Sequence, residues 1–371
     1  MVKIKNFGIF ESCFSAMKRL YSTILRSLLL IIGLIIISLV TFIVIISVND
    51  FNPSEKISLD ISNQSEVVEL NDTISLLSWN MGYSGLGKDM DFFYDGGTQV
   101  RASRELSTEY LNENLLALED FSEIDFLLLQ EIDFDSKRSY GIDQLFAIAD
   151  RLQDHEYSKA LNYKVDFIPV PPASPMGKVK AGLVSMSVYA SKGAERYAYP
   201  NIASWPDKLF LLDRCFMLNR YSFKDKELVV INTHNSYYVK EDSLRMIELN
   251  ILKKVAEEEF AKGNFVIIGG DWNMNPPVLK SDLLLANSLF QKDVSHIRDD
   301  YLNDWNWAYD PNTPTNRTLD HPLGKQTRYA YIDYFVCSPN IQILEVETID
   351  LGFVNSDHNP VKLVLTFNIR K

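Results

Sequence analysis

The sequence predicts a layered α/β domain with two packed β-sheets, preceded by one N-terminal transmembrane helix. Three observations support this prediction. Short apolar runs alternate with longer amphipathic segments from residue 73 onward, several runs are continuously apolar, and residues 27–49 carry no charge. Continuously apolar strands are typical of sheets that are covered on both faces. A single open sheet with so many strands tends to split into two packed sheets, with helices outside them.

The N-terminal segment predicts a membrane anchor. The uncharged residues 27–49, rising about 1.5 Å each as a helix, can cross a hydrocarbon core of roughly 30 Å. A cleaved signal peptide is the alternative, but its apolar core is usually only about 7 to 15 residues long. No small-residue cleavage site follows cleanly, so we expect an uncleaved span.

The charges before this span predict its orientation. Five basic residues and one acid precede it, namely Lys3, Lys5, Lys18, Arg19, Arg26 and Glu11. The positive-inside rule therefore places residues 1–26 in the cytoplasm as a short basic N-terminus. We expect a single-pass protein of the cell membrane whose remaining chain lies outside the cytoplasm.

The rest of the chain is expected to hold a linker and one domain. Residues 50–72 are polar, with Pro53 and scattered Ser and Asn, and predict a linker. No similar break interrupts residues 73–371. Five of the 37 basic residues and one of the 49 acidic residues precede residue 50, so residues 50–371 hold 32 basic and 48 acidic residues, a formal charge of −16. Such a field repels polyanions, which disfavours a nuclease without excluding one.

The apolar runs define the expected strands. They cover residues 73–80, 124–133, 180–191, 209–221, 226–235, 265–273, 329–338, 341–352 and 361–369. Helices are expected between them, at 104–120, 141–153, 241–262 and 278–288. Cys215 and Cys337 lie within two of the strand-like runs, where we expect buried free thiols rather than a disulfide.

Polar residues recur where these strands end. The set comprises Asn80 in "LLSWN", Glu131 in "FLLLQE", His234 in "VVINTHN", Asp271 and Asn273 in "VIIGGDWN", and Asp357 and His358 in "SDHNP", with Asp333 inside "YIDYFVCS". Any one of these residues is commonly found capping a turn. Together they indicate a reaction centre, because strand ends at one edge of a sheet bring such side chains close together.

This set suits the metal-assisted attack of water on a phosphate ester. Glu131 and Asp357 are hard oxygen ligands for Mg²⁺, with Mn²⁺ as an alternative ion, and the metal would polarise a phosphoryl oxygen. Asp271 can activate the attacking water, and the Asn273 amide can orient the phosphate.

Two histidines complete the predicted chemistry. We expect His358, oriented by an acid such as Asp333, and His234 to donate hydrogen bonds to the charge that develops in the transition state.

The motifs "WNMG", "QEID", "THN", "GGDWN", "YIDYFVCS" and "SDHNPV", in this order, resemble the endonuclease/exonuclease/phosphatase superfamily. The resemblance covers about residues 73 to 368. It implies a four-layered sandwich, with two mixed sheets face to face and helices outside, and a divalent-metal phosphoesterase. It also implies that Asn80 lies near the metal. Many relatives orient the histidine equivalent to His234 with a further acid or Tyr, and the sequence does not identify that partner.

Three weaker predictions concern the surroundings of the site. The Gly- and aromatic-rich residues 81–103 are either a substrate-contacting flap or an ordered surface loop. Arg214 in "LDRCF" and Asn316 in "PTNRT" are candidate substrate-binding residues. Most arginines, however, are surface ion-pair partners.

The sequence is compatible with three functions. The first is a membrane-anchored phosphoesterase that acts on a lipid or small-molecule phosphate ester outside the cytoplasm. The second is an extracellular nuclease acting on DNA or RNA, and the third is a non-catalytic binding domain. The third is disfavoured because every polar position that the resemblance implies is filled. The anchor and the acidic charge favour the first, the ester itself stays open, and nothing in the sequence predicts a protein partner.

Overall fold

The computed structural model describes residues 5–237, 242–277, 279, 289–291 and 294–368. The chain divides into two compact units, Met1–Asp50 and Phe51–Lys371. The first unit consists of one helix, α1 (Lys5–Val48), whose segment Ser12–Val48 is long and apolar enough to cross a membrane. A membrane span and a signal sequence share this property. The predicted helix at 278–288 lies largely outside the described residues.

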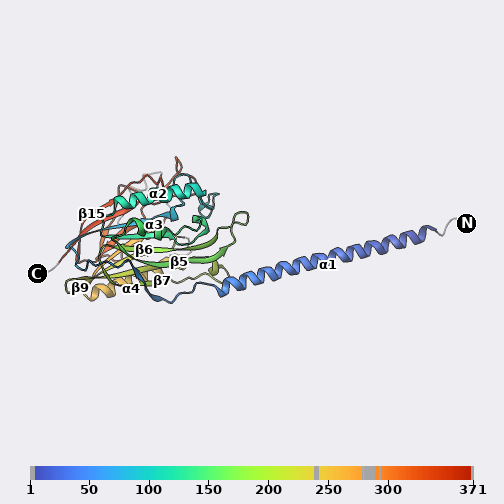
Figure 1. Cartoon of the computed structure of the whole chain (residues 1–371), viewed down its shortest axis with the longest axis horizontal. Coiled ribbons are helices and arrows are strands. Elements are labelled where there is room, and N and C mark those ends of the chain that lie inside the picture. The colour runs from blue at the N-terminus through green and yellow to red at the C-terminus, as the bar shows by residue number, and fades with distance from the viewer. Residues whose placement is uncertain (1–4, 238–241, 278, 280–288, 292–293, 369–371) are drawn as a thin grey trace. The chain divides into compact units, whose positions relative to one another are not determined.

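The second unit contains two seven-stranded mixed sheets (Figure 1). The first sheet is built from β2 (Ile61–Ser62), β3 (Thr73–Asn80), β4 (Phe126–Asp133), β5 (Glu156–Ile168), β6 (Gly177–Ser187), β15 (Ile341–Thr348) and β16 (Val361–Phe367). Its strand order is β15-β16-β3-β4-β6-β5-β2.

The second sheet is built from β1 (Lys56–Leu59), β7 (Ser191–Ala198), β8 (Cys215–Phe223), β9 (Lys226–His234), β10 (Phe265–Asp271), β11 (Asn306–Ala308) and β14 (Asp333–Cys337). Its strand order is β1-β7-β8-β9-β10-β14-β11. A separate ribbon pairs β12 (Asn316–Arg317) with β13 (Tyr329–Ala330). Single 3₁₀ turns occur at η1 (Gly82–Ser84), η2 (Phe93–Asp95), η3 (Lys137–Ser139) and η4 (Asp207–Phe210).

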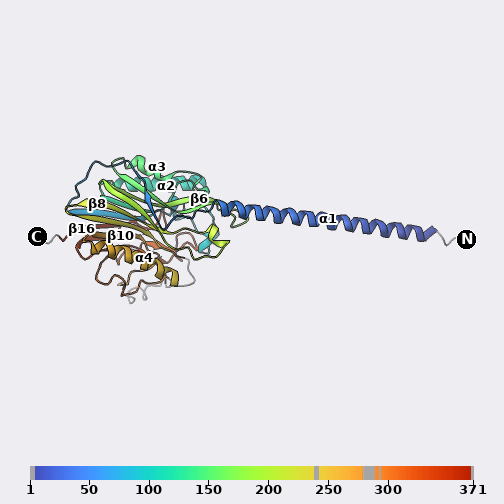
Figure 2. The same cartoon turned by 90° about the horizontal axis from the view of Figure 1, so that it is seen from below.

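Three apolar layers hold this unit together. Between the sheets, Leu76 and Phe126 of the first pack with Val230 and Ile267 of the second. Helices α2 (Arg104–Asp120) and α3 (Gln144–Arg151) cover the outer face of the first sheet, and α4 (Asp242–Ala261) covers that of the second. Figure 2 shows α2 and α3 on one side of the sheets and α4 on the other. The predicted four-layered α/β sandwich is confirmed.

Glycine permits the tight approach of neighbouring strands in "GGDWN". Gly270 has φ +142, and a Cβ there would lie 2.0 Å from the Thr233 carbonyl oxygen on β9. A Cβ at Gly269 would meet the Phe335 ring at 2.4 Å. Any larger residue would therefore push β10 away from its neighbours, and β10 ends at a predicted site residue, Asp271.

The structure differs from the sequence prediction in the segment 50–72. This segment was expected to be a polar linker, but Lys56–Leu59 and Ile61–Ser62 are strands that extend the edges of the two sheets. Strands β5 and β7 were also not predicted. Residues 209–214 were expected to lie in a strand, whereas β8 begins only at Cys215.

Candidate active site

The second sheet brings three of the predicted residues together through its register. Strands β9 and β10 are parallel, and His234 lies opposite Asp271. Strand β14 is antiparallel to β10 and places Asp333 opposite the same residue. The end of two strands and the start of a third therefore meet at one point.

The first sheet supplies further predicted site residues where its strands begin and end. Asn80 ends β3 and pairs with Gln130 of the parallel strand β4. The next residue, Glu131, has φ 55 at a break in the β4–β6 register. Such an irregularity redirects a side chain, and here it turns the Glu131 carboxylate toward the site. Asp357 and His358 lie in the loop that leads into β16.

Asn80 connects the two sheets at the site. Its side-chain nitrogen donates to Asp271 Oδ2 at 2.9 Å and lies 3.4 Å from Glu131 Oε1. Its side-chain oxygen accepts a hydrogen bond from the Gly82 backbone N–H at 3.0 Å. The Asn80 amide is thus held from one side and orients two carboxylates on the other.

His358 is held as a cation. Its Nδ1 lies 2.8 Å from Asp333 Oδ2, in a pair that is almost fully buried. Burial alone would lower the pKa of His358, but the carboxylates of Asp333 and Asp357 outweigh burial and raise that pKa to about 10. Nε2 lies 2.9 Å from the side-chain amide of Asn316. Because a charged imidazole donates from both nitrogens, the amide oxygen of Asn316 is the atom that suits this contact.

Asp271 has a pKa near neutral pH. Its burial, and next the charge of Asp333, raise the pKa of Asp271 to about 7. The Asn273 backbone N–H donates to Oδ1 at 2.9 Å, which fixes the carboxylate plane. The Asn273 side-chain nitrogen donates to the Asn235 carbonyl at 2.8 Å and keeps a second N–H for another acceptor.

His234 is the neutral counterpart of His358. Burial, followed by the positive charges of Arg214 and His358, lowers the pKa of His234 well below its ordinary value. Nε2 lies 3.3 Å from Asp271 Oδ2, so the partner that the sequence left open is Asp271. Within the described residues, its buried Nδ1 has no hydrogen-bond partner.

The carboxylates at the site fit a divalent cation. Asp357 Oδ1 is buried and finds no hydrogen-bond donor among the described residues. Burial raises the pKa of Asp357 to about 6, and repulsion from Glu131 adds to that shift against the pull of His358. A buried carboxylate oxygen without a donor, beside a second carboxylate, is the environment that an oxygen-preferring cation stabilises.

A second group of possible ligand atoms belongs to Asp271, Asp333 and His358, which all lie within 4.8 Å of one another. In this group Asp333 is already bound to a protonated imidazole, whose nitrogens cannot ligate a metal. This group therefore fits a metal ion less well than the carboxylates of Asp357 and Glu131 do.

The site opens into a cavity of about 480 Å³. Eight of the ten predicted residues line it: Glu131, Arg214, His234, Asp271, Asn273, Asn316, Asp357 and His358. Asn80 and Asp333 lie behind this lining and hold those that face the cavity. The remaining wall is largely apolar and includes Leu86, Phe92, Tyr163, Met176 and Leu212. One cavity thus combines a polar reaction centre with an apolar wall.

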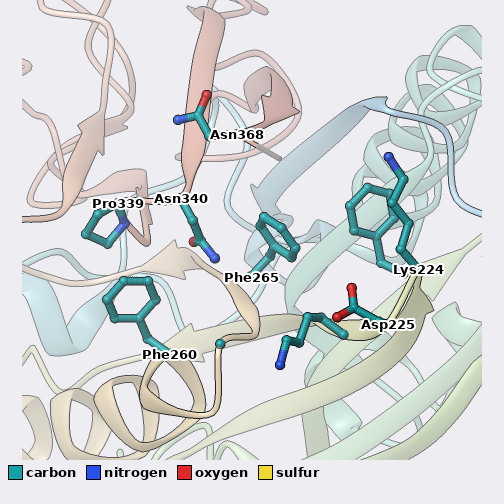
Figure 3. A pocket seen from close by; sticks show the side chains of 10 residues that line it. Lys224, Asp225, Phe260, Phe265, Pro339, Asn340 and Asn368 are labelled. Carbon is teal, nitrogen blue, oxygen red and sulfur yellow. The ribbon is translucent and has the colours of Figure 1, made fainter. Parts of the chain in front are cut away.

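A larger cavity of about 690 Å³ lies elsewhere in the domain (Figure 3). Phe260, Phe265, Asn340 and Lys224 line it, and its lining contains Asp225 but no histidine. None of the ten predicted site residues lines this cavity, so size alone does not identify the site.

Sequence motifs missed Tyr83 and Arg138, which also line the catalytic cavity. The Arg138 guanidinium lies 3.7 Å from the centre of the Tyr83 ring and forms a bidentate ion pair with Asp133. The buried Tyr83 hydroxyl has no hydrogen-bond partner within the described part of the chain. Neither residue falls in a recognisable pattern, and only the folded loop brings them to the cavity.

Residues 81–103 form an ordered loop that lines the cavity, and the substrate contact that the sequence suggested for them stays a prediction. Arg317 donates to the carbonyl oxygens of Leu86 and Gly87 at 3.0 and 2.8 Å, so the first part of the loop is tied to the body of the domain. Farther along, Phe92 and Tyr94 line the cavity. The loop is therefore ordered at its base and contacts the cavity at its tip.

A family model described as the Endonuclease/Exonuclease/phosphatase family matches residues 77–358. Among solved structures, the chain is similar to an endonuclease/exonuclease/phosphatase from Beutenbergia cavernae DSM 12333, with 16% identity, a TM-score of 0.53, and 80% of this chain and 72% of that one covered. ANGEL2, a 2',3'-cyclic phosphatase, matches with 15% identity, a TM-score of 0.52, and coverage of 84% and 99%.

A third similar structure is a family protein from Leptotrichia buccalis C-1013-b, with 12% identity, a TM-score of 0.50, and coverage of 79% and 100%. No curated protein sequence matches the chain. At these identities the structural likenesses establish the fold, while the family assignment comes from the family model.

Proposed function

The chain belongs to the endonuclease/exonuclease/phosphatase family, whose members are hydrolases of phosphate ester bonds, and we propose that it is a membrane-anchored, divalent-metal-dependent phosphoesterase acting outside the cytoplasm. We further propose a lipid or a small molecule as the carrier of the phosphate ester. The observation that carries the proposal is the convergence of two histidines on one carboxylate at the wall of one cavity: His234 Nε2 lies 3.3 Å and His358 Nε2 lies 3.9 Å from Asp271 Oδ2.

In this proposal Glu131 and Asp357 hold the metal, and Asn80 orients the Glu131 carboxylate. Mg²⁺ is the proposed ion, with Mn²⁺ as an alternative, because the ligands are carboxylate oxygens. When bound, the ion supplies positive charge that polarises a phosphoryl oxygen. The family generally uses divalent metals, and the buried, donor-free Asp357 Oδ1 supports a cation at this point.

The proposed reaction begins with water between Asp271 and the phosphorus atom. Asp271 takes one proton from the water while the new P–O bond forms and the bond to the leaving oxygen breaks. The free N–H of the Asn273 amide orients the phosphate. His358, charged and fixed by Asp333, then donates from Nε2 to the oxygens on which negative charge grows. The single N–H of the neutral His234 stays on Asp271 Oδ2 and holds that carboxylate in place.

Arg214 is the proposed binding group for the ground-state phosphate. It lines the cavity, and within the described residues its Nη1 is buried without a hydrogen-bond partner. The neighbouring cations are already engaged, since Arg138 binds Asp133 and Arg317 binds loop carbonyls. The cavity therefore offers little positive charge for a long polyanion, which supports a single phosphate ester over nucleic acid.

Three variants test the site. We expect Asp271→Asn and His358→Ala to lower the rate of hydrolysis of bis-p-nitrophenyl phosphate by about 10²-fold or more while the circular dichroism spectrum stays unchanged. Glu131→Gln should raise the Mg²⁺ concentration needed for half-maximal rate. Full activity in all three variants would show that these residues are not the reaction centre.

A further inference from the structure

Large apolar side chains stand exposed on three neighbouring segments of the second unit. We call them the apolar rim: Tyr94 of η2, Phe167 and Val170 at the tip between β5 and β6, and Ile202, Trp205 and Leu211 between β7 and β8. Trp205 is 60% exposed and Ile202 is 53% exposed. Single exposed apolar residues are common on soluble domains, but a contiguous group usually marks a binding surface.

The three segments pack against one small core and surround the same cavity. Ile168 and Met176, which flank the β5–β6 tip, belong to this core, and Phe92 and Phe210 pack against it. The Tyr163 hydroxyl donates to the Phe210 carbonyl at 3.0 Å. Tyr94 and Leu211 of the rim also line the catalytic cavity. The rim is thus the outer margin of the cavity's apolar wall.

The chain enters the domain beside this rim. The Arg196 guanidinium lies 5.7 Å from the centre of the Phe51 ring and donates to the Asp213 carbonyl at 2.7 Å. Asp213 stands between Leu212 and Arg214, both of which line the cavity. Phe51, the first residue of this unit, is therefore one side chain away from the cavity wall.

The connection to the N-terminal helix is short. Strand β1 begins at Lys56, and the Ala198 N–H donates to the Glu55 carbonyl at 2.8 Å, so the chain is attached to the domain from its first residues. Helix α1 ends at Val48, three positions before Phe51. Three extended residues reach at most about 11 Å. A helix that crosses a bilayer would therefore keep the entry point, and the rim beside it, close to the lipid surface.

We propose that the apolar rim docks onto the lipid bilayer that holds the N-terminal helix, and that it opens the apolar wall of the cavity to a lipid. Trp and Tyr side chains favour the membrane–water interface, and branched aliphatic side chains gain by leaving water. A lipid that enters from the rim carries its acyl part along the apolar wall and its phosphate ester toward Asp271. The docking stands alone, whereas the hydrolysis of that lipid rests on the proposed function.

Tryptophan fluorescence tests the docking without any catalysis. Trp205 is the exposed one among the five tryptophans, because Trp79, Trp272 and Trp305 are buried and Trp307 is half-buried. The full chain is reconstituted in vesicles of phosphatidylcholine whose acyl chains carry bromine, which quenches tryptophan that touches them. We expect brominated lipid to quench part of the tryptophan emission of the wild-type protein. This quenching should be absent in the Trp205→Phe variant.

A matched control places a tryptophan away from the rim. Leu344 is 51% exposed on β15, the strand at the opposite edge of the first sheet from β5 and β2. In Trp205→Phe/Leu344→Trp, the added emission should not be quenched by brominated lipid. Equal quenching at positions 205 and 344, or none at 205, would overturn the proposal. Shielding of Trp205 that depends on protein concentration rather than on lipid would also overturn it and assign the rim to a second copy of the chain.

A kinetic comparison separates the docking from the proposed function. Ile202, Trp205 and Val170 lie outside the cavity lining, so a triple substitution to serine should leave the hydrolysis of soluble bis-p-nitrophenyl phosphate unchanged. Hydrolysis of a phospholipid in vesicles should fall by about tenfold or more, because each lost interfacial side chain weakens docking by roughly that factor. An equal lipid rate in both proteins would contradict the docking. Failure of the wild type to hydrolyse the soluble ester would instead contradict the proposed function.

Discussion

The two histidines of the site face opposite electrostatic surroundings. His358 touches two carboxylates and is charged, while His234 is buried near Arg214 and His358 and is neutral. In the proposed reaction, the charged His358 stabilises the charge that grows on the phosphate, and the neutral His234 positions Asp271. The difference arises from the placement of Asp333 in β14, opposite the proposed base Asp271.

The rate is expected to follow a bell-shaped pH profile. Asp271 accepts a proton only as the carboxylate, and its pKa is raised to about 7, so the rate should rise as the pH passes through about 7. His358 donates only as the cation, and its pKa is raised to about 10, so the rate should fall above about pH 10. Initial rates at saturating metal between pH 5 and 11 measure both limbs, and a rate independent of pH across this range would contradict the assignment.

Asp333→Asn should move both limbs of that profile to lower pH. The Asp333 carboxylate stabilises the His358 cation and destabilises the Asp271 carboxylate, so its removal lowers the pKa of both groups. We expect shifts of about one pH unit or more. A variant that loses rate without moving either limb would show that Asp333 matters only for the fold.

At the residue scale, polar residues at strand ends in the sequence identify most, but not all, of the side chains that the structure gathers. All ten predicted residues lie at the cavity or directly behind it, because each occurs at a strand end or beside one. Tyr83 and Arg138 were missed since their position depends on a loop with Tyr83 at φ 42, which no pattern encodes. The partner of His234 also required the β9–β10 register.

Strand β10 illustrates how an element constrains the site. We expect Gly270→Ala to destabilise the protein by about 3 kcal/mol or more, because the residue has φ +142 and its Cβ would lie 2.0 Å from a backbone oxygen. Chemical denaturation measures this loss. Gly324→Ala is the control, since its Cβ meets nothing closer than 3.8 Å and should cost little. Equal stability of the two variants would contradict the close packing of β9 and β10.

A buried pair of amides joins the sheets beside the site. Gln130 Nε2 donates to Asn232 Oδ1 at 2.8 Å, and Asn232 Nδ2 donates to the Val184 carbonyl at 3.0 Å. Asn232→Ala should cost about 1–3 kcal/mol of folding free energy, because it removes the buried hydrogen bond from Gln130 and the bonds that Asn232 donates to the Leu129 and Val184 carbonyls. The double variant Gln130→Leu/Asn232→Leu should recover part of that loss. A double variant that is less stable than the single one would contradict this explanation.

At the element scale, helix α2 and strand β3 match their predicted bounds. The strands that the sequence did not predict share a physical cause. Strand β5 alternates exposed and buried residues and carries Lys159 and Lys164 on its polar face, so it has no continuous apolar run. Strands β1 and β2 are short edge strands that form only by pairing with β7 and β5. These strands form because they pair with residues that are distant in the sequence, and a local sequence pattern does not contain that information.

The whole molecule combines an acidic domain with an apolar N-terminal helix. A formal charge of −16 on residues 50–371 disfavours the approach of a polyanion. In the proposed function, Arg214 meets the phosphate and the apolar wall of the cavity accepts the uncharged part of the ester. These features together favour a lipid or small-molecule ester over DNA.

The most direct test is Mg²⁺-dependent hydrolysis by the full chain, measured side by side on plasmid DNA, sphingomyelin, phosphatidylinositol phosphates and bis-p-nitrophenyl phosphate, with Asp271→Asn as the blank. We predict product from a lipid or from the small ester, loss of that product in the blank and in excess chelator, and intact plasmid. Nicking of the plasmid alone would contradict this account and identify the protein as a nuclease.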